Sequence, residues 1–226
     1  MLTANPTDTA IAVFDSTAER FASAVDQQIA TGGYLRGDIF MLAAVSSVPA
    51  LGDILDYGCG PGRISAILAR CGFRVRGFDT SPSMVAIAQS QSLTGLDVEF
   101  RTGGIDTGDA PQSTYDAVVC SSVIEYVTEA EKLLRWFHNA LRPSGVLIIS
   151  FAVSSVFRRY VGLRNSTDYI DSQKHTWNWR QFRALLNRTG FTPVRKPIYF
   201  DSYHDEFTCL RSPLGALLGL VIARKS

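Results

Sequence analysis

The chain has 226 residues, which is enough for one globular domain with its own hydrophobic core. Apolar residues make up 46% of the sequence, charged residues make up 19% and the formal net charge is +1, which excludes a disordered chain and a coiled coil. The longest apolar run, at 214–223, is too short to cross a membrane, and residues 1–10 lack the basic start of a secretory signal.

The near-neutral net charge conceals two parts of opposite sign. Residues 1–150 hold 10 basic and 16 acidic side chains, whereas residues 151–226 hold 12 basic and 5 acidic ones. The basic excess lies mainly at 158–196, and it indicates either a solvated surface or a patch that attracts an anionic substrate. Because it forms no recognisable nucleic-acid module, we expect neither a nucleic-acid partner nor a membrane partner.

Two helical segments precede the first predicted strand. Apolar residues at spacings of three and four predict one amphipathic helix over 14–29. A Gly-Gly pair ends this helix, and a second helix is predicted at 34–48, closed by a proline. We expect residues 1–50 to form a helical lid over one compact domain at 51–226.

Strands and helices alternate in the rest of the chain, and two late apolar stretches near 193–200 and 216–223 predict a closing strand pair. This alternation predicts a doubly wound, mostly parallel, seven-stranded sheet of the Rossmann-like α/β class, with a terminal antiparallel strand. The predicted strands are 53–57, 74–79, 97–101, 115–120 and 145–151, and the predicted helices begin after Gly62, at Ser81-Pro82, near residue 129 and after Asn178.

The most informative segment is DYGCGPG at 56–62, which joins the first predicted strand to a helix. Glycine allows positive φ angles and lets the backbone approach a ligand that a Cβ atom would exclude. N–H groups at the start of the following helix attract electron-rich ligand groups. Asp79, at the tip of the second strand, is placed to accept hydrogen bonds from the two hydroxyls of a ribose. The segment therefore predicts a nucleoside site.

The spacing of the glycines separates this site from a dinucleotide site. The dinucleotide pattern G-x-G-x-x-G needs its third glycine at the position of Arg63, whereas the glycines here fall at 58, 60 and 62. The sequence also has no GK[ST] phosphate-binding loop. We therefore predict a ligand that has a ribose but no phosphates.

The DxGxGxG motif, followed by an acid at the next strand tip, resembles the class I S-adenosylmethionine-dependent methyltransferases. The segments YDAVVCSSVIEYV at 115–127 and LRPSGVLII at 141–149 are similar to that family's fourth-strand motif and to its turn into the fifth strand. The resemblance covers roughly residues 10–200. It implies S-adenosyl-L-methionine as the methyl donor, S-adenosyl-L-homocysteine as the product and a small molecule as the acceptor.

The resemblance also implies roles for single residues. The loop glycines would meet the methionine moiety, Asp79 would hold the ribose, and Asp56 would orient the loop or the methionine amino group. Arg36 lies where relatives hold the methionine carboxylate, and its alternative is an ordinary exposed arginine. Ser121 would line the sulfonium end. The implied cofactor-binding residues are Arg36, Asp56, Gly58, Cys59, Gly60, Gly62, Asp79, Thr80, Met84, Gly104, Ile105, Cys120 and Ser121.

Metal chemistry is not expected. The four cysteines form no CxxC pair, so we predict neither a zinc site nor a disulfide scaffold but a reduced, cytoplasmic protein. The ubiquinone-pathway O-methyltransferases, which this chain broadly resembles, have an acidic metal-binding cluster after strand four. This chain has Ser122-x-x-Glu125-Tyr126 there, so we predict no metal and a different acceptor.

Two residues are candidates for the catalytic side of the site. His175 lies where relatives place a pocket residue, and the ordinary pKa of histidine suits removal of a proton from a phenol. Its alternative is a structural hydrogen bond. Tyr126 follows the fourth strand and is predicted to shape the acceptor pocket, and the loop at 154–177 is predicted to cover it.

These features predict a methyltransferase that acts on oxygen in an aromatic or acidic metabolite, as a monomer or a homodimer. The alternatives are methylation of nitrogen or carbon, methylation of RNA, and a regulatory protein that binds S-adenosylmethionine without chemistry.

Overall fold

The described part of the chain builds one central sheet with helices on both faces. The computed structural model describes residues 6–105, 111–155, 172–200, 209–210 and 217–226. Its strands are β1 (Asp53–Tyr57), β2 (Arg74–Asp79), β3 (Val98–Thr102), β4 (Tyr115–Cys120), β5 (Leu141–Ala152), β6 (Phe191–Pro193), β7 (Ile198–Phe200), β8 (Cys209–Leu210) and β9 (Leu218–Lys225). Its helices are α1 (Pro6–Ser16), α2 (Ala18–Ala30), α3 (Leu35–Ser47), α4 (Arg63–Arg70), α5 (Pro82–Gln89), α6 (Ala130–Ala140) and α9 (Trp179–Arg188).

The strand order confirms the predicted doubly wound, mostly parallel sheet. Among the described residues the order is β3-β2-β1-β4-β5-β9-β7-β8, and the neighbours from β3 to β5 are parallel. β9 is antiparallel to β5, and both β6 and β7 pair with β9 at different points along it. The strand order reverses between β1 and β4, and ligands of such sheets bind beyond the carboxyl ends of the strands at this point.

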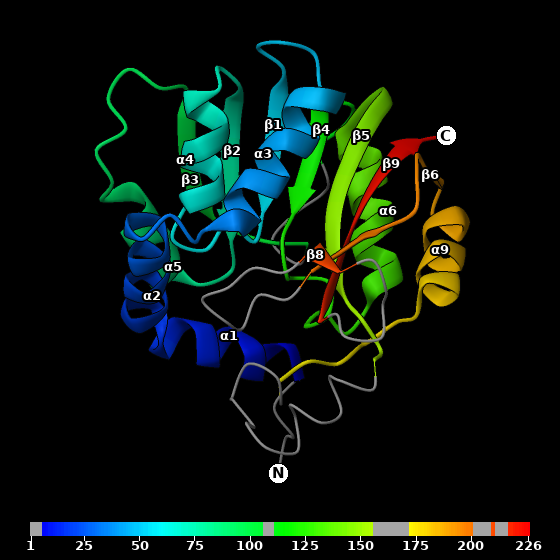
Figure 1. Cartoon of the computed structure of the whole chain (residues 1–226), viewed down its shortest axis with the longest axis horizontal. Coiled ribbons are helices and arrows are strands. Elements are labelled where there is room, and N and C mark those ends of the chain that lie inside the picture. The colour runs from blue at the N-terminus through cyan, green and yellow to red at the C-terminus, as the bar shows by residue number, and fades with distance from the viewer. Residues whose placement is uncertain (1–5, 106–110, 156–171, 201–208, 211–216) are drawn as a thin grey trace.

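Two packed layers cover the sheet (Figure 1). On one face, α6 and α9 bury apolar side chains, and the ring of Phe182 stacks on Phe151 at 4.1 Å between centroids. On the other face, α3 and α4 cover the central strands, and Phe40 of α3 is fully buried there. The helix α3 is therefore part of the core, whereas α1 and α2 contact α5.

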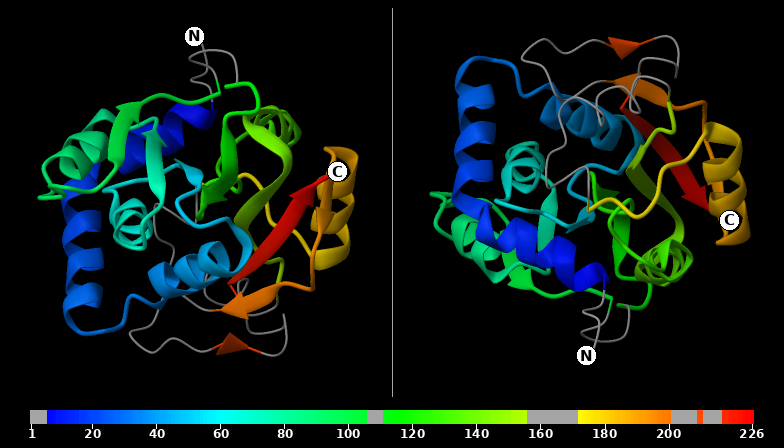
Figure 2. Two further views of the ribbon diagram at one scale, coloured as in Figure 1. Left: turned by 90° about the horizontal axis from the view of Figure 1, so that it is seen from above. Right: turned by 90° about the horizontal axis from the view of Figure 1, so that it is seen from below.

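The amino-terminal helix differs from its prediction. The expected single helix over 14–29 is wrong, because the chain forms α1 and α2 with a break at Thr17. The hydroxyls of Ser16 and Thr17 both donate to the Val13 carbonyl, at 3.1 and 2.7 Å. Side chains that compete for helical carbonyls in this way bend or interrupt helices. As a result α1 runs across the carboxyl ends of the strands, and α2 turns away beside α5 (Figures 1 and 2).

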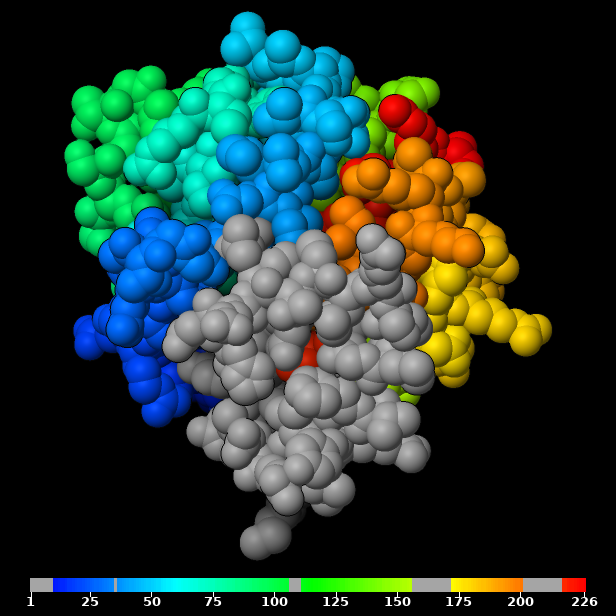
Figure 3. Space-filling view, in the orientation of Figure 1, coloured from blue at the N-terminus to red at the C-terminus, as the bar shows by residue number. Residues whose placement is uncertain are grey.

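On the face shown in Figure 3, the side chains of α2, α3 and α4 form one continuous surface. Within the described residues, no helix combines the length and the hydropathy that a membrane span requires.

Candidate functional site

The glycine loop joins β1 to α4 with three left-handed residues. The φ angles of Gly58, Gly60 and Gly62 are 74°, 52° and 78°, a region that L side chains rarely adopt. The N–H groups of Gly58 and Cys59 both donate to the carbonyl of Phe78, at 2.7 and 3.0 Å. The loop is therefore fastened to the end of β2, next to the predicted acid of that strand.

The three glycines are needed for different reasons. A Cβ atom on Gly58 would overlap the side chain of Val123, and one on Gly62 would lie 2.7 Å from the Phe100 ring. A Cβ atom on Gly60 would meet no atom within 4 Å. The outer glycines therefore permit close packing, whereas the space beside Gly60 is open to a ligand.

Asp79 faces this loop from the tip of β2. Its Oδ2 atom accepts a hydrogen bond from the Gly60 N–H at 2.8 Å, and its Oδ1 atom accepts one from the Ser81 N–H at 2.9 Å. Burial nevertheless raises the pKa of this carboxyl above its ordinary value. The backbone hydrogen bonds from Ser81, Gly60 and Thr80 act in the opposite direction and lower this pKa.

Asp56 is the buried acid at the neighbouring strand. It is 1% exposed and accepts a hydrogen bond from the Ser65 hydroxyl at 2.6 Å. Burial is the main cause that raises the pKa of Asp56 to about 7, and the charge of Asp79 adds to it. Burial raises the pKa of Tyr34 to about 12, and the charges of Arg36 and Asp56 act on it in opposite directions, so Arg36 lies within electrostatic range of the same region.

Gly104 and Ile105, two of the implied cofactor-binding residues, lie against the same strand tips. The Ile105 N–H donates to the Tyr57 hydroxyl at 3.1 Å, and the Gly103 N–H donates to the Asp79 carbonyl at 2.9 Å. A Cβ atom on Gly104 would lie 2.8 Å from a methyl carbon of Thr80. The structure therefore brings 104–105 and Thr80 together beside Asp79.

Two of the predicted residues lie deeper in the molecule. The side chain of Cys59 packs in a cluster with Val85 and Phe100, so it points away from the open side of the loop. Met84 is 1% exposed in the first turn of α5. Both support the site from behind, since their side chains are enclosed by protein.

The turn that follows β4 contains a strained residue, Ser122, that the sequence did not indicate. Cys120 is fully buried, and burial raises the pKa of its thiol. Ser122 has a φ of 53°, and its N–H donates to the hydroxyl of Ser150 at 2.8 Å. The side-chain oxygens of Ser121 and Ser122 are buried and have no hydrogen-bond partner among the described residues. Left-handed non-glycine residues often mark functional loops.

The two catalytic candidates lie beyond this turn. The Tyr126 hydroxyl accepts a bond from the Gln173 amide at 3.4 Å, and the Tyr126 ring packs edge-on against Phe14 of α1 at 5.2 Å between centroids. Nε2 of His175 lies 3.1 Å from the Thr128 carbonyl. Because a carbonyl only accepts, Nε2 is the donor, which favours the structural alternative for this histidine. Its role as a base stays a prediction.

The segment before α9 is tied to the same turn. The backbone N–H groups of Lys174 and His175 donate to the Glu125 carbonyl at 2.7 and 3.1 Å. Of the predicted covering loop at 154–177, residues 156–171 lie outside the described part of the chain. Among the residues that are described, no group of three or more His, Cys, Asp or Glu side chains could hold a metal ion.

Sequence reasoning also missed Asp15 of α1. Its Oδ1 atom accepts hydrogen bonds from the Ser81 hydroxyl at 2.6 Å and from the Ser83 N–H at 3.0 Å. Ser81 was predicted to begin α5, and its side chain caps that helix at the Met84 N–H. Nothing local to residue 15 reveals a contact with a residue 66 positions away.

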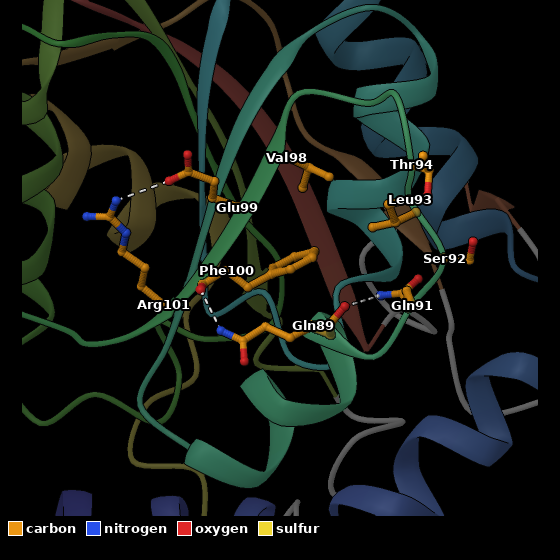
Figure 4. A pocket seen from close by; sticks show the side chains of 10 residues that line it. Gln89, Gln91, Ser92, Leu93, Thr94, Val98, Glu99, Phe100 and Arg101 are labelled. Atoms are coloured by element: carbon orange, nitrogen blue, oxygen red, sulfur yellow. Dashed lines mark hydrogen bonds and ion pairs between the residues drawn. The ribbon is translucent and has the colours of Figure 1, made fainter.

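A separate groove of about 470 Å³ lies behind the loop, between the end of α5 and β3 (Figure 4). The Gln89 amide donates to the Phe100 carbonyl at 3.0 Å within it. The Gln91 amide donates to the Pro61 carbonyl at 2.7 Å, and so it holds the glycine loop from the groove side. The groove is lined by Ala88, Gln89, Gln91, Ser92, Leu93, Thr94, Val98, Glu99, Phe100 and Arg101.

Comparison with known proteins identifies the family. The methyltransferase domain family matches residues 33–196, which is more than half of the chain. The chain belongs to this family. The predicted resemblance to the class I S-adenosylmethionine-dependent methyltransferases is thereby confirmed.

Curated relatives match part of this methyltransferase. The ubiquinone biosynthesis O-methyltransferase of Xanthomonas axonopodis pv. citri (strain 306) is 32% identical over 123 residues, 50% of this chain and 52% of that protein. The protein of the same name from Xanthomonas euvesicatoria pv. vesicatoria (strain 85-10) is 31% identical over 118 residues, 48% of this chain and 49% of its own length. The match thus spans about half the length of these relatives.

Solved structures share the fold of this methyltransferase over nearly the whole chain. The magnesium protoporphyrin IX methyltransferase of Synechocystis PCC 6803, with bound SAH, has a TM-score of 0.70 at 23% identity and covers 94% of this chain and 96% of its own. The 1,6-didemethyltoxoflavin-N1-methyltransferase of Burkholderia thailandensis has a TM-score of 0.69 at 18% identity and covers 100% and 92%. At these identities the likeness shows the fold.

Proposed function

We propose that this protein transfers a methyl group from S-adenosyl-L-methionine to a small-molecule acceptor and releases S-adenosyl-L-homocysteine. The observation that carries the proposal is the pair of carboxylates at adjacent strand tips, Asp56 and Asp79, beside the open backbone of Gly60. Neither carboxylate forms an ion pair within the described residues. Membership of the methyltransferase domain family and the SAH bound in the Synechocystis structure support the same ligand.

The charge of the site fits this cofactor. S-adenosylmethionine carries a sulfonium and an ammonium group against one carboxylate, so it is a net cation. The raised pKa values of Asp56 and Asp79 report a site in which negative charge is costly until a cation arrives. This argument therefore supports a cationic cofactor such as S-adenosylmethionine.

Each side of the crevice would then bind a different part of the cofactor. We propose that Asp79 accepts hydrogen bonds from the ribose hydroxyls, and that the Gly60 backbone meets the methionine moiety. Thr80 and residues 104–105 would flank the adenine, and Arg36 would attract the methionine carboxylate. The buried hydroxyl of Ser121 would lie at the sulfonium end.

The reaction is an in-line displacement at carbon, for which the cofactor supplies a methyl group on a sulfonium. The protein must hold the acceptor atom about 3–3.5 Å from that carbon, opposite the sulfur, and positioning of this kind supplies much of the rate. It must also keep water out of the crevice. We propose that α1 and α2 serve this purpose as a lid, because α1 lies across the strand ends (Figure 1).

The acceptor is proposed to be an aromatic small molecule that is methylated on oxygen. The aromatic side chains of Phe14 and Tyr126 meet beyond β4 and support this class. The described basic residues Arg180, Arg183 and Arg188 support an acidic acceptor less well, because α9 packs on the far side of β5 from the glycine loop (Figure 1). Nitrogen and carbon acceptors remain alternatives.

Turnover with a panel of phenols, carboxylic acids and amines tests the proposal. We expect S-adenosylhomocysteine to form with at least one phenol, and the purified protein to melt at a higher temperature with S-adenosylmethionine than without it. A protein that only binds the cofactor would show the thermal shift without product. A preference for NAD, or no shift with S-adenosylmethionine, would overturn the proposal.

RNA is the alternative acceptor, supported by the basic excess of residues 151–226. It predicts RNA binding that tightens as the salt concentration falls and depends on RNA sequence or structure. Methylation of RNA in place of every small molecule of the panel would favour this alternative.

A further inference from the structure

Asp15 connects the amino-terminal helix to the body of the domain. Its Oδ1 atom accepts bonds from the Ser81 hydroxyl and the Ser83 N–H, at 2.6 and 3.0 Å, at the start of α5. These bonds hold the pKa of Asp15 below its ordinary value. A carboxylate on α1 therefore binds one of the free N–H groups that begin another helix, and it stays ionised at neutral pH.

Ser81 is shared between this contact and the proposed ribose acid. Its hydroxyl donates to Asp15 and accepts from the Met84 N–H at 3.2 Å, while its own N–H donates to Asp79 at 2.9 Å. Asp79 in turn accepts from the Gly60 N–H. An unbroken series of hydrogen bonds thus runs from α1 through Ser81 to the glycine loop.

The residue next to Asp15 holds the other side of α1. Phe14 packs edge-on against Tyr126, beyond β4, with 5.2 Å between ring centroids. Asp15 therefore fixes α1 on the β2 side of the strand reversal and Phe14 contacts the β4 side. Seen from below, α1 lies across the ends of the strands (Figure 2).

We propose that Asp15 is a positioning residue for the cofactor site, which orients Asp79 through Ser81 and couples the seating of α1 to retention of the cofactor. The inference rests on the proposed function, since it concerns the same site. Loss of the Asp15 carboxylate leaves the Ser81 hydroxyl without its acceptor and α1 without its polar anchor. Because coupling between two sites is reciprocal, the cofactor must also stabilise the seated α1.

The experiment compares Asp15→Ala with a matched variant at the other end of the sheet, Asp97→Ala. Asp97 precedes β3 at the amino ends of the strands and pairs with Arg76 at 2.7 Å, so this control also removes a hydrogen-bonded carboxylate, but away from Ser81 and the glycine loop. We expect Asp15→Ala to raise the Kd and KM for S-adenosylmethionine roughly tenfold, as for loss of a charge-assisted hydrogen bond, with kcat changed less. Asp97→Ala should change them less than threefold. Equal effects of the two variants would overturn the inference.

Amide hydrogen exchange supplies a second readout. In the unmodified protein, S-adenosylhomocysteine should slow exchange in α1, and in Asp15→Ala this protection should disappear. If Asp15→Ala does not fold, Asp15→Asn, which keeps one acceptor, should show a smaller loss of protection. Undiminished protection in a folded variant would overturn the inference.

A double-mutant cycle tests whether the effect passes through Ser81. If it does, Asp15→Ala should change the Kd much less in a Ser81→Ala background than in the unmodified protein. Additive effects would contradict the coupling. Failure of the unmodified protein to bind S-adenosylmethionine would refute the proposed function instead, so the two failures are distinguishable.

Discussion

The aspartates at the two ends of the parallel strands have opposite electrostatic surroundings. At the amino ends, Asp53 accepts two hydrogen bonds from Arg74, at 2.6 and 2.9 Å, and one from Arg142 at 2.9 Å. Arg142 also donates to Asp116 at 2.6 Å. The Arg74 hydrogen bonds are the main cause that holds the pKa of Asp53 below its ordinary value. This end is neutralised by the protein itself.

At the carboxyl ends, Asp56 and Asp79 have no arginine partner among the described residues, and burial raises both pKa values. Asp53 and Asp56 are only three positions apart in β1, so the difference comes from their surroundings and not from the strand. Paired carboxylates stabilise a fold, whereas unneutralised ones lower its stability and are typical of functional sites. The comparison supports the proposed cofactor site at the carboxyl end.

The largest expected effect is on cofactor affinity at the carboxyl end. Asp79→Ala should weaken binding of S-adenosylmethionine by about 1.5–3 kcal/mol, because hydrogen bonds to a charged group are lost. Asp53→Ala, at the amino end, should leave the affinity unchanged. Titration calorimetry measures both. An Asp79→Ala variant with full affinity would show that Asp79 is not part of the cofactor site, and it would contradict the difference between the two ends.

The next effect concerns stability and pH. The pKa of Asp56 lies at about 7 in the folded chain against an ordinary 3.8, so the folded state binds more protons between these values. The neutral form of Asp56 therefore stabilises the folded state fully below pH 3.8, and this stabilisation is lost as the pH rises through about 7. Asp56→Asn, which can still accept from Ser65, should therefore be more stable than the unmodified protein above pH 7.

The expected gain is on the order of 1–2 kcal/mol, as when a buried unpaired charge is replaced by a neutral group. Urea unfolding at several pH values measures it, and the gain should shrink as the pH falls from about 7 towards 3.8. The same variant should bind S-adenosylmethionine more weakly. A variant that is less stable at every pH would show that Asp56 is neutralised in the folded protein.

The smallest effect is at the amino end. Arg142→Ala should lower the free energy of unfolding by about 1 kcal/mol, because the Arg142 side chain is 41% exposed and solvent screens its two ion pairs. The loss should appear at neutral pH and shrink in acid, since a carboxyl with a lowered pKa stabilises the fold only while it is ionised. Unfolding in urea measures the loss, and a changed cofactor affinity would contradict the separation of the two ends.

Much of the fold could be predicted because its signals are local. The strands at 53–57, 74–79 and 115–120 have the predicted bounds. β5 is longer than predicted, since Leu141 pairs with Tyr115 across an irregularity in the register. That pairing depends on a strand elsewhere in the chain, and the apolar pattern of 145–151 alone does not contain it.

The candidate site likewise has features that the sequence indicates locally and features that depend on distant contacts. The glycine spacing and the acid at the next strand tip indicated Gly60 and Asp79, which the structure places in direct contact. The left-handed Ser122 and the contact of Asp15 with Ser81 were not predicted, because each depends on residues brought together only by folding. The role of His175 as a base rests on the family resemblance, and its contact with Thr128 could not be read from the sequence.

The position of β9 constrains how the chain is assembled during synthesis. β9 follows every other described strand in sequence, yet it lies between β5 and the pair β6 and β7. Seven residue pairs join it to β5. Until the ribosome has made residues 218–225, the long edge of β5 has no neighbour, and exposed edges of this kind invite aggregation. Among the described strands, the last one made is therefore the one that covers this edge of the parallel sheet.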